Sequence, residues 1–104
     1  MEKTQVLAAL KAASEAPYTV TPGPTGGCGR AYVCVSTDKK TTNQVASACK
    51  TLGLTFLRRA YGTAGNAIYL GYDNADGRAL ARSKAFAAVL TQHGIPAYDE
   101  AVAD

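Results

Sequence analysis

The spacing of apolar residues predicts a helix at the start of the chain and a strand after it. Residues 4–16 place a stripe of mostly apolar side chains at helical spacing, and Pro17 ends the pattern. The stripe consists of Val6, Leu7, Leu10, Ala13 and Ser14. Residues 30–36 instead alternate, with valines on one face and Tyr32 and Cys34 on the other, which is typical of a strand. We expect the valines to face the core.

A second helix is bounded by two independent signals. Thr41 and Gln44 have the spacing of a capping box, and Gly53 suits the left-handed conformation that ends many helices. Between these signals lies one apolar stripe, formed by Val45, Ala48, Cys49 and Leu52. We therefore expect Cys49 to be a core residue.

The second half of the chain predicts a hairpin, a helix and a last strand. Residues 54–61 and 66–72 are strand-like, and the four residues between 61 and 66 suit an antiparallel connection. The helix that follows starts near a capping residue and ends before Gly94 and Pro96. Its candidate caps are Asp73, Asn74 and Asp76, and its stripe is Ala79, Leu80, Ser83, Phe86, Ala87 and Leu90. Residues 97–102 predict a short strand.

From residue 30 onward, the predicted order is strand, helix, strand, strand, helix, strand. This is the split βαβ order of the α+β, ferredoxin-like fold, in which two helices cover one face of an antiparallel sheet. We expect a single domain with a helical and loop extension at 1–29, including a possible short extra strand at 18–21, and a core at 30–104. The first helix, which must bury its own stripe, is the obvious candidate to cover the other sheet face.

Composition narrows the class of protein. The chain has 104 residues, 47% of them hydrophobic, which is enough for one self-sufficient domain. Its first residues lack the uninterrupted apolar core of a secretory signal, and no stretch is long enough to span a bilayer. Three cysteines without a C-x-x-C spacing disfavour a disulfide framework and a zinc site. We expect a soluble cytoplasmic protein without a cofactor or contact with a membrane.

The charges are unevenly distributed along the chain. The formal net charge is +3, but residues 30–84 carry nine basic and three acidic residues, whereas residues 85–104 carry three acidic residues and no Lys or Arg. Arg78 and Arg82 have a spacing at which like charges repel on a helix. Such placements favour an acidic partner, although a solvated, mildly basic surface is the alternative. The candidate binding residues are Lys39, Lys40, Lys50, Arg58, Arg59, Arg78 and Arg82.

Two tyrosines carry a partial resemblance to RNA recognition motifs. Tyr32 in the first core strand and Tyr69 in the third occupy positions where such domains place aromatic rings. The resemblance implies that these two rings stack the bases of single-stranded RNA on an exposed sheet. The third-strand motif is incomplete in this chain, because Ala67 stands where a second aromatic residue belongs and Ala64 precedes Gly65 where a basic residue belongs. The alternative is that a helix covers both rings.

Enzymatic chemistry has weaker signals. Residues 23–30 are rich in glycine and could hold an anion together with Arg30, but a strand follows them where a phosphate-binding loop requires a helix. Cys28 lies in this segment, which contains no lysine, metal motif or helix start that would lower its pKa. His93 is the only histidine and lies where it caps a helix C-terminus. Acylphosphatases share the fold class, but residues 36–42 lack the glycine and arginine of their loop.

We therefore expect a non-catalytic binding protein whose basic surface engages a nucleic acid or a protein complex that handles nucleic acid. One version is a phage or mobile-element inhibitor of the anti-CRISPR type, which acts by occluding a site. One alternative is a single-stranded RNA-binding domain that uses the sheet tyrosines. Another is a small enzyme or ligand sensor that uses the glycine-rich loop and Cys28. A homodimer through the sheet face or an edge strand is also possible.

Overall fold

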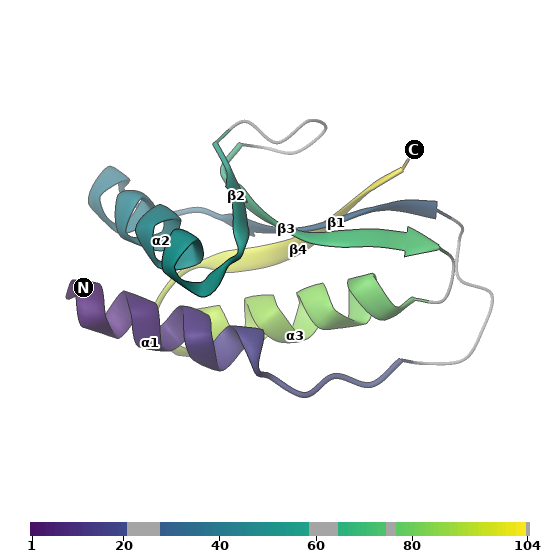
Figure 1. Ribbon diagram of the computed structural model, residues 1–104, viewed down its shortest axis with the longest axis horizontal. Helices are drawn as coiled ribbons and strands as arrows, with labels where there is room; N and C mark the ends of the chain where they lie inside the picture. The colour runs from purple at the N-terminus through teal and green to yellow at the C-terminus, as the bar shows by residue number, and fades with distance from the viewer. Residues whose placement is uncertain (21–27, 59–64, 75–76, 104) are drawn as a thin grey trace.

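The computed structural model describes residues 1–20, 28–58, 65–74 and 77–103. Within them the chain forms a sheet with helices on one side (Figure 1). In chain order the elements are α1 (Lys3–Ser14), β1 (Cys28–Val35), α2 (Lys39–Leu52), β2 (Thr55–Leu57), β3 (Ala67–Asn74), α3 (Arg78–Gln92) and β4 (Ala97–Ala103). Residues 18–20 are not a strand, and residue 21 of the possible extra strand lies outside the described ranges.

The sheet has the strand order β2-β3-β1-β4, and every neighbouring pair is antiparallel. β1 is therefore a central strand. β2 follows β1 in the chain, but β3 lies between these two strands in the sheet. This is the arrangement that the split βαβ order predicts, so the α+β, ferredoxin-like fold is confirmed.

The N-terminal ends of α2 and α3 differ from the predicted ones. α2 begins two residues earlier than Thr41, with Asp38 as its N-cap, and a hydrogen bond from the Thr41 side chain lowers the pKa of the Asp38 carboxyl group. Gly53 ends this helix as predicted, at a φ of 75°. The N-cap of α3 is Gly77, because β3 runs on through Asp73 and Asn74. Asp76, the third candidate cap, lies outside the described residues.

The main core lies between the sheet and the helices. The inward residues of β1 and β3, which include Val33, Val35 and Ile68, pack against Phe86 and Leu90 of α3. Val45, Ala48 and Cys49 of α2 belong to the same cluster. Cys49 is fully buried as predicted, and burial raises the pKa of its thiol to about 12.

The position of α1 corrects one expectation. α1 packs against α2 and α3 on the helix side of the sheet, not on the opposite face (Figure 1). Val6, Leu10 and Ala13 join the same core as the other two helices. On the helix side, the apolar stripe of α1 packs against aliphatic residues of α2 and α3, whereas the opposite sheet face carries tyrosines and polar groups. The prediction that this helix covers the second sheet face is therefore wrong.

A β-bulge changes the direction of side chains along β3. Tyr32 of β1 is paired with Tyr69, whereas the preceding residue Ala31 is paired with Gly71, so Leu70 is an extra residue in β3. Gly71 has a φ of 118°, a conformation that glycine adopts at little cost. After the bulge, Tyr72 lies opposite Arg30 and shares its face of the sheet.

Candidate functional site: the open face of the sheet

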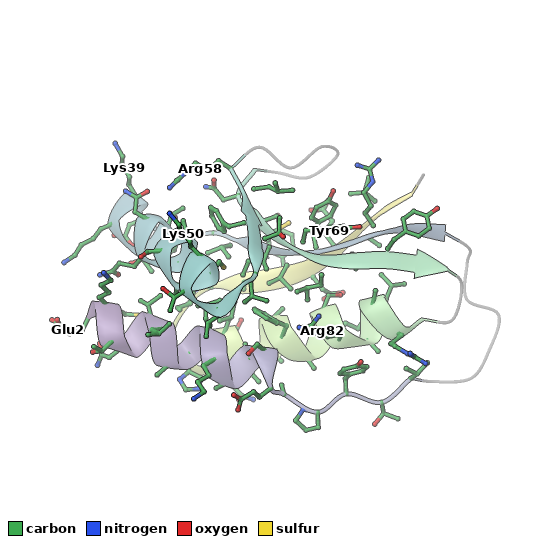
Figure 2. All side chains as sticks on the ribbon, in the orientation of Figure 1. Glu2, Lys39, Lys50, Arg58, Tyr69 and Arg82 are labelled. Atoms are coloured by element: carbon green, nitrogen blue, oxygen red, sulfur yellow. The ribbon has the colours of Figure 1, made fainter. Side chains whose placement is uncertain are left out.

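The sheet face opposite the helices, which we call the open face, is built from three rows of paired residues. One row comprises Tyr72, Arg30 and Val102; the middle row comprises Thr55, Tyr69, Tyr32 and Glu100; the last row comprises Leu57, Ala67, Cys34 and Tyr98. Figure 2 shows Tyr69 on this side, away from α1 and α3. The apolar cluster of the face contains no helix residue. Within the described residues, the face therefore lacks a helical cover.

The middle row holds the two tyrosines that the sequence singled out. Their rings are 5.5 Å apart between centroids and tilted by 51°. Tyr32 is only 2% exposed, because it packs against Tyr69 and shares a small cluster with Cys34 and Ala67. Tyr69 is half-buried. Tyr32 therefore supports its neighbours, and Tyr69 is the member of the pair that solvent reaches.

Two further tyrosines, which the sequence reasoning missed, are the most exposed rings of the face. Tyr72 is 42% exposed and Tyr98 is 44% exposed. They lie at opposite corners, two rows along the strands and two strands across, so their Cα atoms are on the order of 16 Å apart. The alternation of β4 places Tyr98 opposite Cys34 and could have revealed it, whereas the bulge hides the orientation of Tyr72.

A polar cluster adjoins Tyr98. The Cys34 thiol donates a hydrogen bond to Oε2 of Glu100 at 3.0 Å. The pKa of the Tyr98 hydroxyl is raised, first by the negative charge that Cys34 acquires at alkaline pH, then by burial and by a hydrogen bond with Cys34. The phenol therefore remains a neutral hydrogen-bond donor across the physiological pH range. The cluster brings a thiol, a carboxylate and a phenol together at one corner of the open face.

The predicted basic residues occupy separate places. Lys39, Lys40 and Lys50 belong to α2, and the guanidinium of Arg58 lies over the ring of Phe56, 5.6 Å from its centroid. Figure 2 shows Lys39, Lys50 and Arg58 at the α2 end of the molecule, whereas Arg82 lies on α3 beneath the sheet. Arg59 lies outside the described residues.

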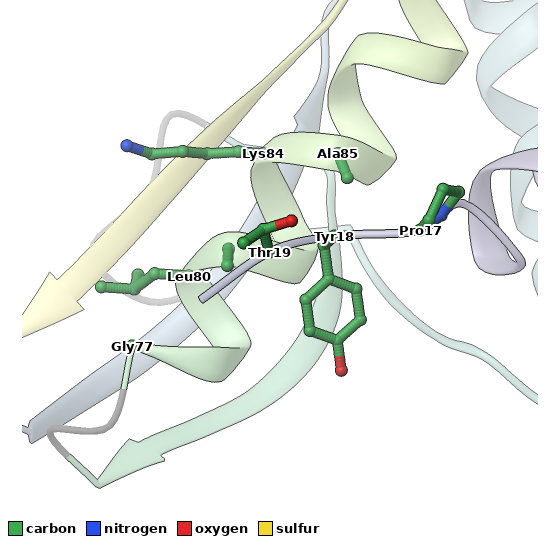
Figure 3. A pocket seen from close by; sticks show the side chains of 8 residues that line it. Pro17, Tyr18, Thr19, Gly77, Leu80, Lys84 and Ala85 are labelled. Atoms are coloured by element: carbon green, nitrogen blue, oxygen red, sulfur yellow. The ribbon is translucent and has the colours of Figure 1, made fainter. Parts of the chain in front are cut away.

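The other two arginines lie beside the linker that follows α1. Arg78 and Arg82 line a hollow of about 330 Å³ together with Tyr18, Gly71 and Tyr72. A second hollow of about 450 Å³ lies where the linker crosses α3, and Figure 3 shows the ring of Tyr18 on one side of the linker and Lys84 on the other. The described lining of both hollows contains cations, hydroxyls and apolar groups but no carboxylate, thiol or imidazole.

The remaining candidates for chemistry are placed as follows. His93 is the C-cap residue of α3, where a partial positive charge is favourable. Cys28 is the first residue of β1, and its side chain is outside what the structure describes, as are the glycine-rich residues before it. Among the described side chains, no three His, Cys, Asp or Glu residues are grouped as metal ligands.

No protein-family model matches the chain, and no curated protein or solved structure matches it either. In the part of the chain that the structure describes, no helix has the length and apolar character needed to cross a membrane. The open face is thus assigned as the candidate site from its geometry alone.

Proposed function

We propose that this protein binds single-stranded RNA across the open face of its sheet. The observation that supports the proposal is that exposed tyrosines stand on a sheet face whose cluster includes no helix residue. β1 and β3, the two central strands, supply Tyr32, Tyr69 and Tyr72, and β4 adds Tyr98. Sheets that bind single strands place aromatic rings in this way.

The spacing of the rings suits a strand that crosses the sheet. Every base offers a flat π-face, and stacking of a base on an aromatic ring contributes about 1–3 kcal/mol per base. Tyr72 and Tyr98 are the exposed platforms at the two corners, and Tyr69 lies in the middle row, on the same strand as Tyr72. A short single strand would therefore meet Tyr72 and Tyr69 along β3 and then cross the sheet to Tyr98 on β4.

The charge of the molecule is compatible with a polyanion. The net charge is +3, Arg30 lies in the first row of the face, and Figure 2 shows Lys39 and Arg58 toward the same side of the molecule as Tyr69. The nearby carboxylate, Glu100, accepts a hydrogen bond from Cys34. Because phosphate contacts release counterions, we expect the affinity to fall as the salt concentration rises.

Fluorescence anisotropy with a labelled 12-nucleotide single-stranded RNA tests the proposal. Tyr72→Ala and Tyr98→Ala should each weaken binding by roughly 5- to 150-fold, which corresponds to the loss of one stacked base. Tyr18→Ala is the matched control for Tyr98→Ala, because Tyr18 is 40% exposed and lies beside α3, where it shares a hollow with Tyr72 but not with Tyr98. This control should bind like the unchanged protein.

Two outcomes would contradict the proposal. One is the absence of binding to any single-stranded RNA at low salt by a protein whose circular dichroism shows it to be folded. The other is equal weakening by all three tyrosine substitutions, which would mean that the open face has no special part in binding. A duplex of the same sequence should bind more weakly than the single strand, because its bases are not free to stack on the rings.

The α2 end of the molecule favours a second candidate. Lys39, Lys40, Lys50 and Arg58 lie on α2 and just after β2, and they would suit an acidic surface of a protein complex that handles nucleic acid. An inhibitor of the anti-CRISPR type would act in this way. Affinity capture from a lysate treated with nuclease tests it: a protein partner should remain, and the double variant Lys39→Glu, Lys50→Glu should lose it. Loss of all partners after nuclease treatment would contradict this candidate.

A further inference from the structure

A polar hollow opens at the corner of the open face where β1 ends and β3 begins. It measures about 230 Å³ and is lined by Cys34, Ser36, Thr37, Asn66 and Tyr98, among others. Sites for drug-sized ligands usually measure about 300–1,000 Å³, so this hollow suits a smaller group. Tyr98, one of the two exposed rings of the face, belongs to its wall.

Backbone hydrogen bonds hold the rim of the hollow in place. The amide of Val35 donates to the carbonyl of Asn66 at 3.0 Å, and the amide of Ser36 donates to the carbonyl of Pro96 at 3.0 Å. These bonds join the end of β1 to the segments that lead into β3 and β4. The side chains around the hollow are therefore carried by a connected backbone, which lowers the entropic cost of binding a ligand there.

The lining supplies both donors and acceptors of hydrogen bonds. The side-chain amide of Asn66 has both, and so does the hydroxyl of Ser36. The hydroxyl of Thr37 donates to Oδ1 of Asp38 at 3.1 Å and therefore presents its oxygen as an acceptor. An aromatic wall beside a set of neutral polar groups is the combination that recognises an unstacked base.

We infer that this hollow receives one base of the bound RNA, which stacks against Tyr98 while its polar edge is read by Asn66 and Ser36. The inference rests on the proposed function and adds sequence preference to it. The other rings of the face tolerate every base, because stacking alone does not distinguish them. The hollow is the place on the open face where one base is preferred over the others.

The test compares ten-nucleotide homopolymers of uridine, cytidine and adenosine by fluorescence anisotropy. The unchanged protein should bind one of them at least fivefold more tightly than the weakest. Asn66→Ala should reduce this ratio to less than twofold while the affinity for the weakest homopolymer stays the same. Asn43→Ala, at an exposed asparagine on α2, is the matched control and should keep the full ratio.

The possible failures are distinguishable. If all homopolymers bind equally well, the hollow does not read a base, although the proposed function stands. If none binds, the proposed function fails. A nuclear magnetic resonance titration with free nucleosides examines the hollow alone: the side-chain amide signal of Asn66 should shift with one nucleoside more than with the others, and uniform or absent shifts would overturn the inference. Ser36→Ala serves as a second variant if Asn66→Ala does not fold.

Discussion

The two faces of the sheet are made by alternate residues of the same strands, yet they are packed by different means. On the helix face, Val33 and Val35 are covered by a second layer, and Phe86 of α3 is completely buried among them. On the open face, Tyr32 is almost as inaccessible, although the described residues of its cluster all belong to the sheet. Among the described residues, the burial of Tyr32 therefore comes from neighbours within the sheet, such as the ring of Tyr69.

The proposed function would use this difference between the faces. On the helix face, the aliphatic residues of the sheet are buried against the helices, and their burial stabilises the fold. On the open face, Tyr72 and Tyr98 keep large parts of their rings exposed, and under the proposed function these rings would stack on RNA bases. We expect this contrast between the faces to appear in four measurements, of which the first has the largest effect and the last the smallest.

Phe86→Ala should lower the free energy of unfolding by about 3–5 kcal/mol, because it removes a large, fully buried side chain from the helix face. Urea denaturation followed by circular dichroism measures the change. A loss below about 1 kcal/mol would mean that the helix layer is not close-packed on the sheet and would remove the contrast between the faces.

Tyr32→Ala should cost less, about 2–3 kcal/mol, because the neighbours of Tyr32 on the open face are free to move into the space that the ring leaves. The same urea experiment applies. Tyr32→Phe keeps the ring and should lose only a small part of this amount. If Tyr32→Ala costs as much as Phe86→Ala, the open face is packed as rigidly as the covered one.

Cys49→Ala tests whether solvent is excluded from the helix face, because it changes how the free energy of unfolding depends on pH. Burial raises the pKa of this thiol from 9.0 to about 12, so above pH 9 the unfolded chain ionises first and the unchanged protein loses stability. The variant lacks this loss. The gap in stability between the two, measured in urea with a reductant, should therefore shrink by about 2 kcal/mol between pH 7 and about pH 10.5. A gap that stays constant would show that solvent reaches the thiol.

Tyr72→Ala and Tyr98→Ala should change the free energy of unfolding by no more than about 1 kcal/mol, because both rings are over 40% exposed. Thermal unfolding monitored by circular dichroism is sufficient. A larger loss would assign these rings to the structure of the sheet, and any effect on RNA binding would then be indirect.

The sequence was sufficient for the order of elements and therefore for the fold. Alternation in β1 and the stripe that ends at Gly53 are local patterns that tertiary packing did not override. The location of α1 was not predictable in this way, because an apolar stripe shows that a helix is buried on one side but not against which partner. The same limit applied to Tyr32: its inaccessibility depends on residues that are paired with it from distant parts of the chain.

The candidate site was predictable only in part. Tyr69 followed from its position in a strand, and Tyr98 could have been found by alternation along β4. Tyr72 could not, because it stands three residues after Tyr69 and regular alternation places such residues on opposite faces. The hollow beside Tyr98 forms where the end of β1 meets the starts of β3 and β4, which are far apart in the sequence, so no local sequence pattern predicts it.

Side chains along a strand alternate between the two faces of the sheet, and the bulge at Leu70 and Gly71 shifts this alternation by one residue for the rest of β3. A related chain that has one residue fewer between Tyr69 and Tyr72 and a regular strand would present the same two rings on the same face, so a gap at this point in an alignment would preserve the surface. A residue that resists positive φ in place of Gly71 would have the opposite effect. It would favour regular pairing and turn Tyr72 toward the helices, with every tyrosine of the sequence still present. Comparison with future relatives should therefore follow the strand register and not the tyrosine spacing.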